Sequence, residues 1–170
     1  FTAEGYQAHR FDHTDAAQLI ALAMQHPPDF PPGSAWNYSD ANYILAGMII
    51  EAATGRSWAD EVRARILVPL GLGQTHEPGD DPTLPEPHAR SYHQFVEDSP
   101  LVDVTLVNYS RGGAAGSLIT TAADLSRFWM ALRRGDLLGP AMMAEMQRTV
   151  PAPPFEWAWP GVRYGLVGEL

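Results

Sequence analysis

Fifteen prolines and fifteen glycines divide this 170-residue chain into short segments. Proline ends a helix because it lacks a backbone N–H and clashes with the preceding turn, and glycine readily takes the left-handed conformation found at helix ends. The most concentrated break is the run PPDFPPG at 27–33, which predicts a stiff loop. The chain is therefore expected to fold into short helices joined by loops, with a little strand.

The length of the chain corresponds to one domain, residues 1–170, that is large enough to bury a hydrophobic core. Hydrophobic residues make up 45% and charged residues 18%, a composition that excludes a wholly disordered chain. The formal net charge of −9 argues against a nucleic-acid partner, because it repels phosphate backbones. No apolar run reaches the roughly 20 residues of a membrane-spanning helix, so no membrane span is predicted.

Two residue types are missing from the sequence. Without cysteine the chain has no disulfide, no catalytic thiol and no thiolate ligand for a metal. All eleven basic residues are arginine, so no lysine is present to bind phosphate, form a Schiff base or act as a general base. The sequence also begins at Phe1 without an initiator methionine or a signal peptide. We therefore expect it to be a segment of a longer protein.

Apolar residues at helical spacing, each set preceded by a capping residue, predict five helices. They are expected at about 15–25 with Thr14 or Asp12 as the cap, from Ser39 or Asp40 to Gly55, from Ser57 to Pro69, from Thr121 to Gly135, and from Pro140 onward.

Two of these helices have a predicted buried face. In the third helix Val62 and Ile66 are expected to face inward. In the fourth helix the expected buried stripe consists of Leu125, Phe128, Trp129 and Leu132.

The remaining segments lack helical periodicity. Residues 1–13 are polar and predict an opening loop, and 71–88 are rich in Gly, Pro and Asp and predict a surface loop. A short strand is predicted within 89–96, and the glycine-rich run 112–116 predicts a tight turn where the backbone closely approaches a neighbour. Residues 162–170 are expected to start a strand that the chain does not complete.

Tyr38 and Asp40 are candidate functional residues because they stand where the proline-rich loop meets the start of a helix. Such a place can present a phenol hydroxyl into a cleft, next to the positive end of a helix dipole, which favours a phenolate. The alternative is that Tyr38 is a packing aromatic and Asp40 a helix cap. The residues alone leave both interpretations open.

Histidines and serines are weaker candidates. His9 and His13 have a spacing that suits a metal on a helix, but no third potential ligand follows at a spacing typical of a metal site. Both are therefore interpreted as residues of a solvated loop. His88 and His93 are interpreted as surface or strand residues. No G-x-S-x-G motif is present, and nothing local supports a Ser-His-Asp triad assembled by folding.

Four blocks, in order along the chain, resemble the β-lactamase-related serine hydrolases, which include class C β-lactamases, D-alanyl-D-alanine carboxypeptidases and related esterases. The block at 32–55 matches the family's Pro-Gly, its Tyr-Ser-Asn, here Tyr38-Ser39-Asp40, and a helix ending Glu-x-x-Thr-Gly. The other blocks read ILVPLGL at 66–72, AGSLITTAADL at 115–125 and YGL at 164–166. The likeness is strongest to the carboxypeptidase branch.

The resemblance implies a mainly α structure with minor β, the helical subdomain of the β-lactamase/transpeptidase-like fold, from a secreted or periplasmic parent. It also implies acyl transfer through a serine ester on a peptide, β-lactam or ester, without metal or cofactor. Tyr38 would be the general base and proton shuttle, and Asp40 would replace the asparagine that binds the substrate amide and a lysine. The residues expected to line the substrate cleft are Ser110, Arg111, Gly112 and Gly113.

Two motifs of the family are missing from the sequence. S-x-x-K should precede the tyrosine motif, and K/H-T-G should follow the YGL block. We therefore expect an excised part of a hydrolase that is inactive alone, the alternative being a non-catalytic helical binding module that kept the family scaffold. Loss of the family's sheet would leave an apolar patch, rimmed by Trp36, Trp157 and Trp159, through which copies self-associate.

Overall fold

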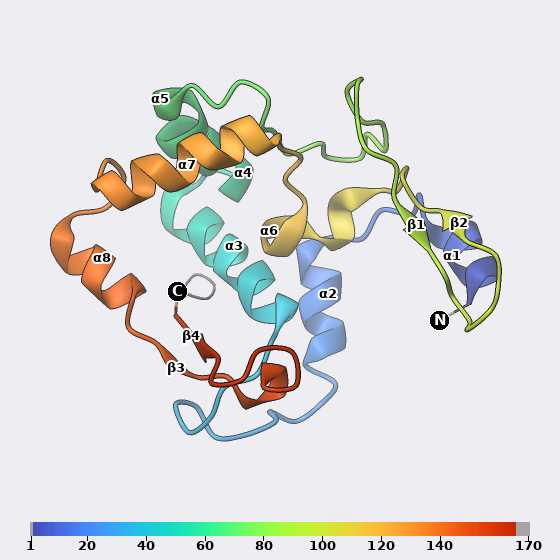
Figure 1. Ribbon diagram of the computed structural model, residues 1–170, viewed down its shortest axis with the longest axis horizontal. Helices are drawn as coiled ribbons and strands as arrows, with labels where there is room; N and C mark the ends of the chain where they lie inside the picture. Colours follow the sequence, from blue (N-terminus) through green and yellow to red (C-terminus); the bar gives the residue numbers. More distant parts are fainter. Residues whose placement is uncertain (1, 166–170) are drawn as a thin grey trace.

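The computed structural model describes residues 2–165 and is built mainly from helices, with two small sheets (Figure 1). The expectation of a mainly α structure with minor β is confirmed. The helical elements are α1 (Ala3–His9), α2 (Ala16–Ala23), α3 (Asp40–Thr54), α4 (Trp58–Val62), the π-helix η1 (Arg63–Leu67), α5 (Val68–Leu70), η2 (Tyr109–Arg111), α6 (Gly113–Gly116), α7 (Ala122–Arg134), α8 (Pro140–Met146) and η3 (Pro153–Phe155). The strands are β1 (Tyr92–His93), β2 (Val102–Asp103), β3 (Val150–Pro151) and β4 (Arg163–Tyr164).

Helix α3 lies at the centre of the molecule and packs against α2, α4 and α6 (Figure 1). Ser39 begins it by accepting a hydrogen bond of 3.3 Å from the backbone N–H of Asn42, and Gly55 ends it in the left-handed conformation, as predicted. A Cβ atom added at Gly47 would lie 2.6 Å from Cβ of Ala114. Helix α6 therefore packs against bare backbone of α3.

The glycine-rich run 112–116 forms a helical turn, so the prediction of a tight turn is wrong in conformation. Here η2 leads directly into α6, and the N–H of Gly112 donates to the carbonyl of Tyr109 at 2.8 Å. A Cβ atom at Gly112 would lie 3.1 Å from the backbone of Gly116. The glycines thus permit the close backbone approach that was expected, inside a helix rather than a loop.

The expectation of a loop over residues 1–13 is wrong for Ala3–His9, which form α1. The Thr2 hydroxyl caps this helix by accepting from the N–H of Gly5 at 3.1 Å. No residue of α1 is buried, so the helix has no apolar stripe that periodicity could reveal. Helix α2 is capped by Asp15, not by Thr14 or Asp12, because Asp15 and Gln18 form a reciprocal capping box.

The third predicted helix continues through three elements, α4, η1 and α5. Pro69 lies in the last turn, inside α5, so the helix ends one residue later than predicted, and Gly71 closes it in the left-handed conformation. Glu61 and Leu67 are buried, while Val62 and Ile66, which were predicted to face inward, are half-buried. Buried Glu61 pairs with Arg56 at 3.4 Å and with Arg65.

Helix α7 begins at its predicted cap Thr121 and ends at Gly135, but its buried face differs from the expected stripe. Within the predicted stripe Leu132 is buried and Phe128 half-buried, but Leu125 and Trp129 are 46% and 40% exposed. Ala131, which was outside the stripe, is buried. The helical spacing identified an apolar face correctly, but in the part of the chain described here no element covers all of it. The helix is tied instead to the loop after α5, where His76 forms a β-bridge with Ile119.

The two sheets are antiparallel pairs. Strand β1, which confirms the strand predicted within 89–96, pairs with β2 so that Tyr92 faces Asp103. Strand β3 pairs with β4 so that Val150 faces Tyr164. Strand β4 lies within the strand expected at 162–170, of which residues 166–170 lie outside the described part. Between residues 2 and 165 no helix combines the length and the apolar character needed to cross a bilayer.

Candidate active site

Tyr38 is the last residue but one before α3, and its backbone is held on both sides. On one side the side-chain carbonyl of Asn37 accepts from the N–H of Tyr38 at 2.9 Å, and Asn37 itself donates to Asp29 at 3.2 Å. On the other side Ser39 caps the helix. The Tyr38 side chain is 57% exposed, and its hydroxyl donates a hydrogen bond of 2.8 Å to Oδ1 of Asp40. The structure therefore brings the two predicted catalytic residues together, with the hydroxyl outside the core.

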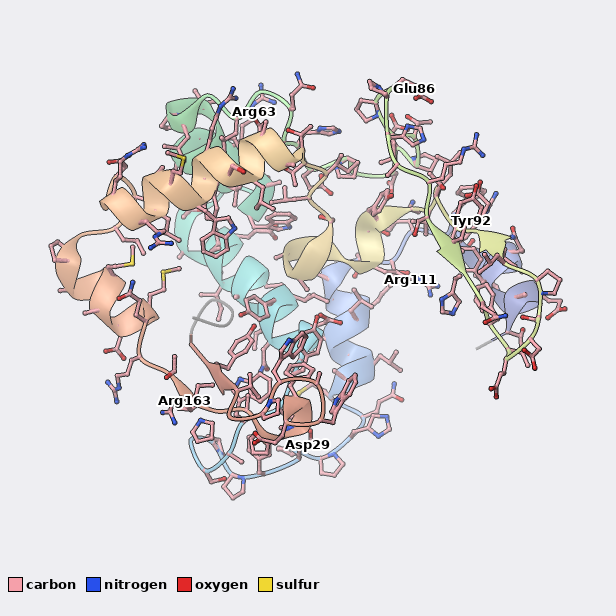
Figure 2. The ribbon with its side chains drawn as sticks, in the orientation of Figure 1. Asp29, Arg63, Glu86, Tyr92, Arg111 and Arg163 are labelled. Atoms are coloured by element: carbon pink, nitrogen blue, oxygen red, sulfur yellow. The ribbon has the colours of Figure 1, made fainter. Side chains whose placement is uncertain are left out.

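Tyr38 faces a cavity of about 450 Å³. The wall of this aromatic cavity comes from the proline-rich loop, α3, strands β3 and β4 and the side chain of Arg148. Five of its thirteen lining residues are aromatic, namely Phe30, Trp36, Tyr38, Tyr43 and Tyr164. The ring of Trp36 lies 4.7 Å from that of Tyr164 and 5.6 Å from that of Phe155. Figure 2 labels Asp29, in the proline-rich loop, and Arg163, in β4, at the end of the molecule where these two segments lie.

Asp40 raises the pKa of Tyr38 above its ordinary value of 10.0, chiefly because the carboxylate accepts a hydrogen bond from the neutral phenol and also because it repels the phenolate. This corrects the expectation that the helix N-terminus makes the phenolate easier to form. The helix end is equivalent to roughly +0.5 of a charge, which the full negative charge of Asp40 in the first turn outweighs. A cation beside Tyr38 would be needed to reverse the direction of the shift.

The residues predicted to line the substrate cleft do not line the cavity beside Tyr38. Ser110 and Gly113 line a second cavity of about 370 Å³, which shares no lining residue with the cavity beside Tyr38. The Ser110 hydroxyl accepts from the N–H of Thr14 at 2.9 Å, which anchors the segment before α2. Exposed Arg111 (Figure 2) lines a separate small cavity near α1, and Gly112 serves the turn into α6.

The second cavity also contains a histidine–aspartate pair that the sequence did not reveal. Nδ1 of His13 lies 2.6 Å from Oδ1 of Asp80, and Asn108 donates to the same oxygen at 2.9 Å. Asp80 raises the pKa of His13, and the hydrogen bonds from Asn108 and His13 lower the pKa of Asp80. The partners are 67 and 28 residues apart, so no local signal could have found them.

His9 and His13 do not act together. Nδ1 of His9 lies 2.7 Å from Asp12, whereas His13 contacts Asp80. Both side chains are mostly exposed, as expected, although His9 belongs to α1 rather than to a loop. Among residues 2–165 no group of three or more His, Asp or Glu side chains is arranged to hold a metal ion.

A mostly helical structure with Tyr38 at the start of its central helix has the architecture of the helical part of the β-lactamase/transpeptidase-like fold. The family model described as Beta-lactamase matches residues 2–168. The chain therefore belongs to the Beta-lactamase family, as the sequence motifs indicated.

Relatives of known name or structure agree with this assignment. Penicillin-binding protein 4 of Amycolatopsis lactamdurans is 33% identical over 121 residues, which cover 66% of this chain and 29% of that protein. A D-stereospecific amidohydrolase from Streptomyces sp. superposes with a TM-score of 0.89 at 43% identity, covering 95% of this chain and 47% of that one.

A D-amino acid amidase from Ochrobactrum anthropi superposes with a TM-score of 0.73 at 32% identity, covering 83% of this chain and 42% of that one. The chain thus spans less than half of the length of these relatives.

Proposed function

We propose that this chain supplies the tyrosine-bearing part of a serine hydrolase that acts on amides or peptides through a serine acyl-enzyme. The observation that carries the proposal is the exposed Tyr38 hydroxyl, held 2.8 Å from Asp40 at the start of α3 and facing an aromatic cavity. The choice of amides and peptides is supported by the likeness to an amidohydrolase and to an amidase.

In the proposed reaction a serine oxygen attacks the substrate carbonyl, an ester forms and the amide C–N bond breaks. Tyr38 takes the proton from the serine and passes it to the departing amine, and water then hydrolyses the ester. Asp40 orients the Tyr38 hydroxyl but raises its pKa, so the reaction requires a cation close by. The lysine of an S-x-x-K motif would supply it. Because these 170 residues contain no lysine, we propose that they are inactive on their own.

The second candidate is a non-catalytic binding module on the same scaffold. Two observations favour it, namely the absence of lysine from the 170 residues and the raised pKa of Tyr38. Neither is expected of a base that works near neutral pH in this chain alone. The aromatic cavity would then bind a small molecule, a peptide or a β-lactam without turning it over.

The encoding gene and a labelling assay separate the two. S-x-x-K upstream and K/H-T-G downstream are expected in the gene. The full gene product and the 170-residue chain would each be incubated with a fluorescent penicillin, a D-alanyl-D-alanine peptide, a D-amino acid amide and a short-chain ester. Covalent labelling that survives denaturation, or turnover, is expected for the full product only.

The other outcomes of this assay are equally informative. Labelling of the 170-residue chain would contradict its proposed inactivity and would point to another nucleophile. A full product that neither labels nor turns over any of the four compounds would favour the binding module.

A further inference from the structure

Arg10, the residue that follows α1, is a half-buried cation without an anionic partner. Of the arginines that form no ion pair within residues 2–165, it alone is half-buried, and the others are exposed. Its guanidinium lies over the ring of Phe11, 4.5 Å from the centroid, and no described residue accepts a hydrogen bond from its N–H groups. An arginine that is partly removed from water is normally paired, so these donors are available to a ligand.

A second unpaired arginine lies beside the first. Arg10 and Arg111 line the same cavity of about 120 Å³, and Arg111 is exposed and has no ion pair in the described part of the chain (Figure 2). Among the described residues no carboxylate lines this cavity. Its third basic residue, His9, already contacts Asp12 at 2.7 Å. Because the two arginines repel each other, an anion between them would lower the electrostatic free energy.

One buried residue holds the backbones of both arginines. The N–H of Asn108 donates to the carbonyl oxygen of Arg10 at 2.7 Å, and its side-chain oxygen accepts from Ser110 at 2.9 Å in η2, which ends at Arg111. Asn108 is 6% exposed and is itself fixed by its hydrogen bond to Asp80. The arginine backbones are thus positioned before a ligand arrives, which reduces the entropy that binding costs.

The carboxylates on the other side of Arg10 have different partners. Arg10 also borders a cavity of about 350 Å³ whose wall contains Glu86 and Asp103. Asp103 pairs with Arg90 at 3.1 Å, and Glu86 lies 3.5 Å from Nδ1 of His88. Neither carboxylate forms an ion pair with Arg10. The cavity shared with Arg111 is therefore the side of Arg10 on which positive charge is uncompensated.

The size and charge of this cavity select a class of ligand. A volume of about 120 Å³ is well below the roughly 300–1,000 Å³ of pockets that hold whole organic ligands, so it suits one small group. Guanidinium N–H groups form a fork that matches the oxygens of a phosphate. A phosphate monoester carries close to two negative charges at neutral pH, which balance two arginines, whereas a carboxylate carries one.

We propose that Arg10 and Arg111 form a binding site for a phosphate group, either free phosphate or the phosphate of a monoester. The site shares no lining residue with the cavity beside Tyr38. Binding also needs no nucleophile, so the inference does not rest on the proposed function.

NMR of the arginine side chains tests the site directly. The Nε–H resonances of the 170-residue chain would be followed at low ionic strength while inorganic phosphate, methyl phosphate or acetate is added. We expect the resonances of Arg10 and Arg111 to shift, and phosphate to bind about fivefold more tightly than acetate, the size of one further exposed charge contact. Salt should weaken binding. Tighter binding of methyl phosphate would identify the ester as the ligand, and tighter binding of inorganic phosphate the free ion.

Arginine-to-glutamine variants assign the binding to these two residues. Arg10→Gln should weaken phosphate binding about tenfold, because charge-assisted hydrogen bonds of a half-buried group are lost, and Arg111→Gln about fivefold. Arg63→Gln is the matched control, since Arg63 is exposed, forms no ion pair between residues 2 and 165 and lines neither cavity of Arg10 (Figure 2). It should leave the affinity unchanged.

Three results would overturn the proposal, namely an unshifted Arg10 resonance, acetate binding as tight as that of phosphate, or equal weakening by Arg63→Gln and Arg10→Gln. If Arg10→Gln does not fold, Arg111→Gln decides, because its position is exposed.

The same titration of the full gene product shows whether the site belongs to the whole protein. We expect the same fold-changes there. Binding by the 170-residue chain alone would overturn the proposal, because another part of the protein would then supply the partner of Arg10. A full product that binds phosphate as expected but is not acylated would refute the proposed function alone.

Discussion

The hydroxyl of Thr75 donates a hydrogen bond of 3.0 Å to Oδ2 of Asp124, 49 residues further along the chain. The same oxygen accepts the N–H of Gln74 at 2.8 Å, and Oδ1 accepts from Arg127 at 3.1 Å. Asp124 is 1% exposed, so a single buried carboxylate joins α7 to the loop that follows α5. Its removal takes the acceptor from the N–H of Gln74, whereas the hydroxyl of Thr75 keeps its contact of 2.8 Å with the hydroxyl of Thr120.

Asp124→Ala is therefore expected to lower the free energy of unfolding by about 2–4 kcal/mol, because a buried carboxylate that accepts from Gln74, Thr75 and Arg127 is lost. Urea unfolding of the 170-residue chain measures the loss. The control Asp60→Ala removes an exposed carboxylate and should cost less than about 1 kcal/mol. Equal losses for the two variants would show that Asp124 does not hold the loop.

Tyr38→Phe is expected to change the free energy of unfolding of this chain by less than about 0.5 kcal/mol, because the hydroxyl is exposed. In the full gene product the same change should reduce the rate of acylation by roughly 10²–10⁴-fold, the usual effect of removing a positioned acid–base group. Urea unfolding and single-turnover acylation are the two measurements. A loss of several kcal/mol, or an unchanged acylation rate, would mean that Tyr38 is a packing residue.

The pair of His13 and Asp80 should make stability depend on pH. The pKa of His13 is raised above 6.5, so the contribution of the pair is complete below pH 6.5 and is lost as the pH rises through the raised value. The pKa of Asp80 is lowered from 3.8, so at the acid end the contribution is present above pH 3.8 and is lost as the pH falls through the lowered value.

His13→Asn keeps a hydrogen-bond donor but does not titrate. The difference in Tm between the natural chain and this variant should be largest between pH 3.8 and pH 6.5, and it should shrink at higher pH. His26→Asn, at an exposed histidine, is the control and should give no such trend. A pH-independent difference for His13→Asn would exclude the ion pair.

Self-association through exposed apolar surface remains a prediction. Of the three tryptophans expected at the rim, Trp157 and Trp159 are 85% and 56% exposed, but Trp36 is half-buried in the aromatic cavity wall. Leu125 and Trp129 add apolar surface on α7. Sedimentation velocity should show oligomers at high concentration, because exposed apolar surface of this kind drives association.

The double variant Leu125→Gln and Trp129→Gln should shift the chain toward monomer, whereas Val96→Thr, at an exposed valine between β1 and β2, should not. A chain that stays monomeric at every concentration tested would contradict the prediction.

Local chemistry explains which features could be predicted from the sequence. Ser39, Gly55, Thr121 and Gly135 act on their own helix ends, within a few residues, and all four take the predicted place. The π-helical turn η1 has no such local signature and was not predicted, and Val62 and Ile66, which were predicted to face inward, are half-buried.

Contacts between distant segments explain the rest. The pairing of Tyr38 with Asp40 spans two residues and was within reach of sequence reasoning, whereas the pairing of His13 with Asp80 spans 67 residues. The exposure of Leu125 depends on what packs against α7, which helical periodicity does not specify. The motif resemblance predicts Ser110 near the substrate, which stays a prediction, and the structure shows that Ser110 and Tyr38 line different cavities.

The contact between Gly47 and Ala114 makes α3 and α6 a single unit for recombination. The space between them has no room for a further methyl group, since a Cβ atom at position 47 would lie 2.6 Å from that of Ala114. A chimera that takes 40–54 from one relative must therefore take 113–116 from the same relative, or the two small residues must be restored together. Crossover points for shuffling this domain are accordingly best placed after Ser117 rather than in the loop between α5 and η2.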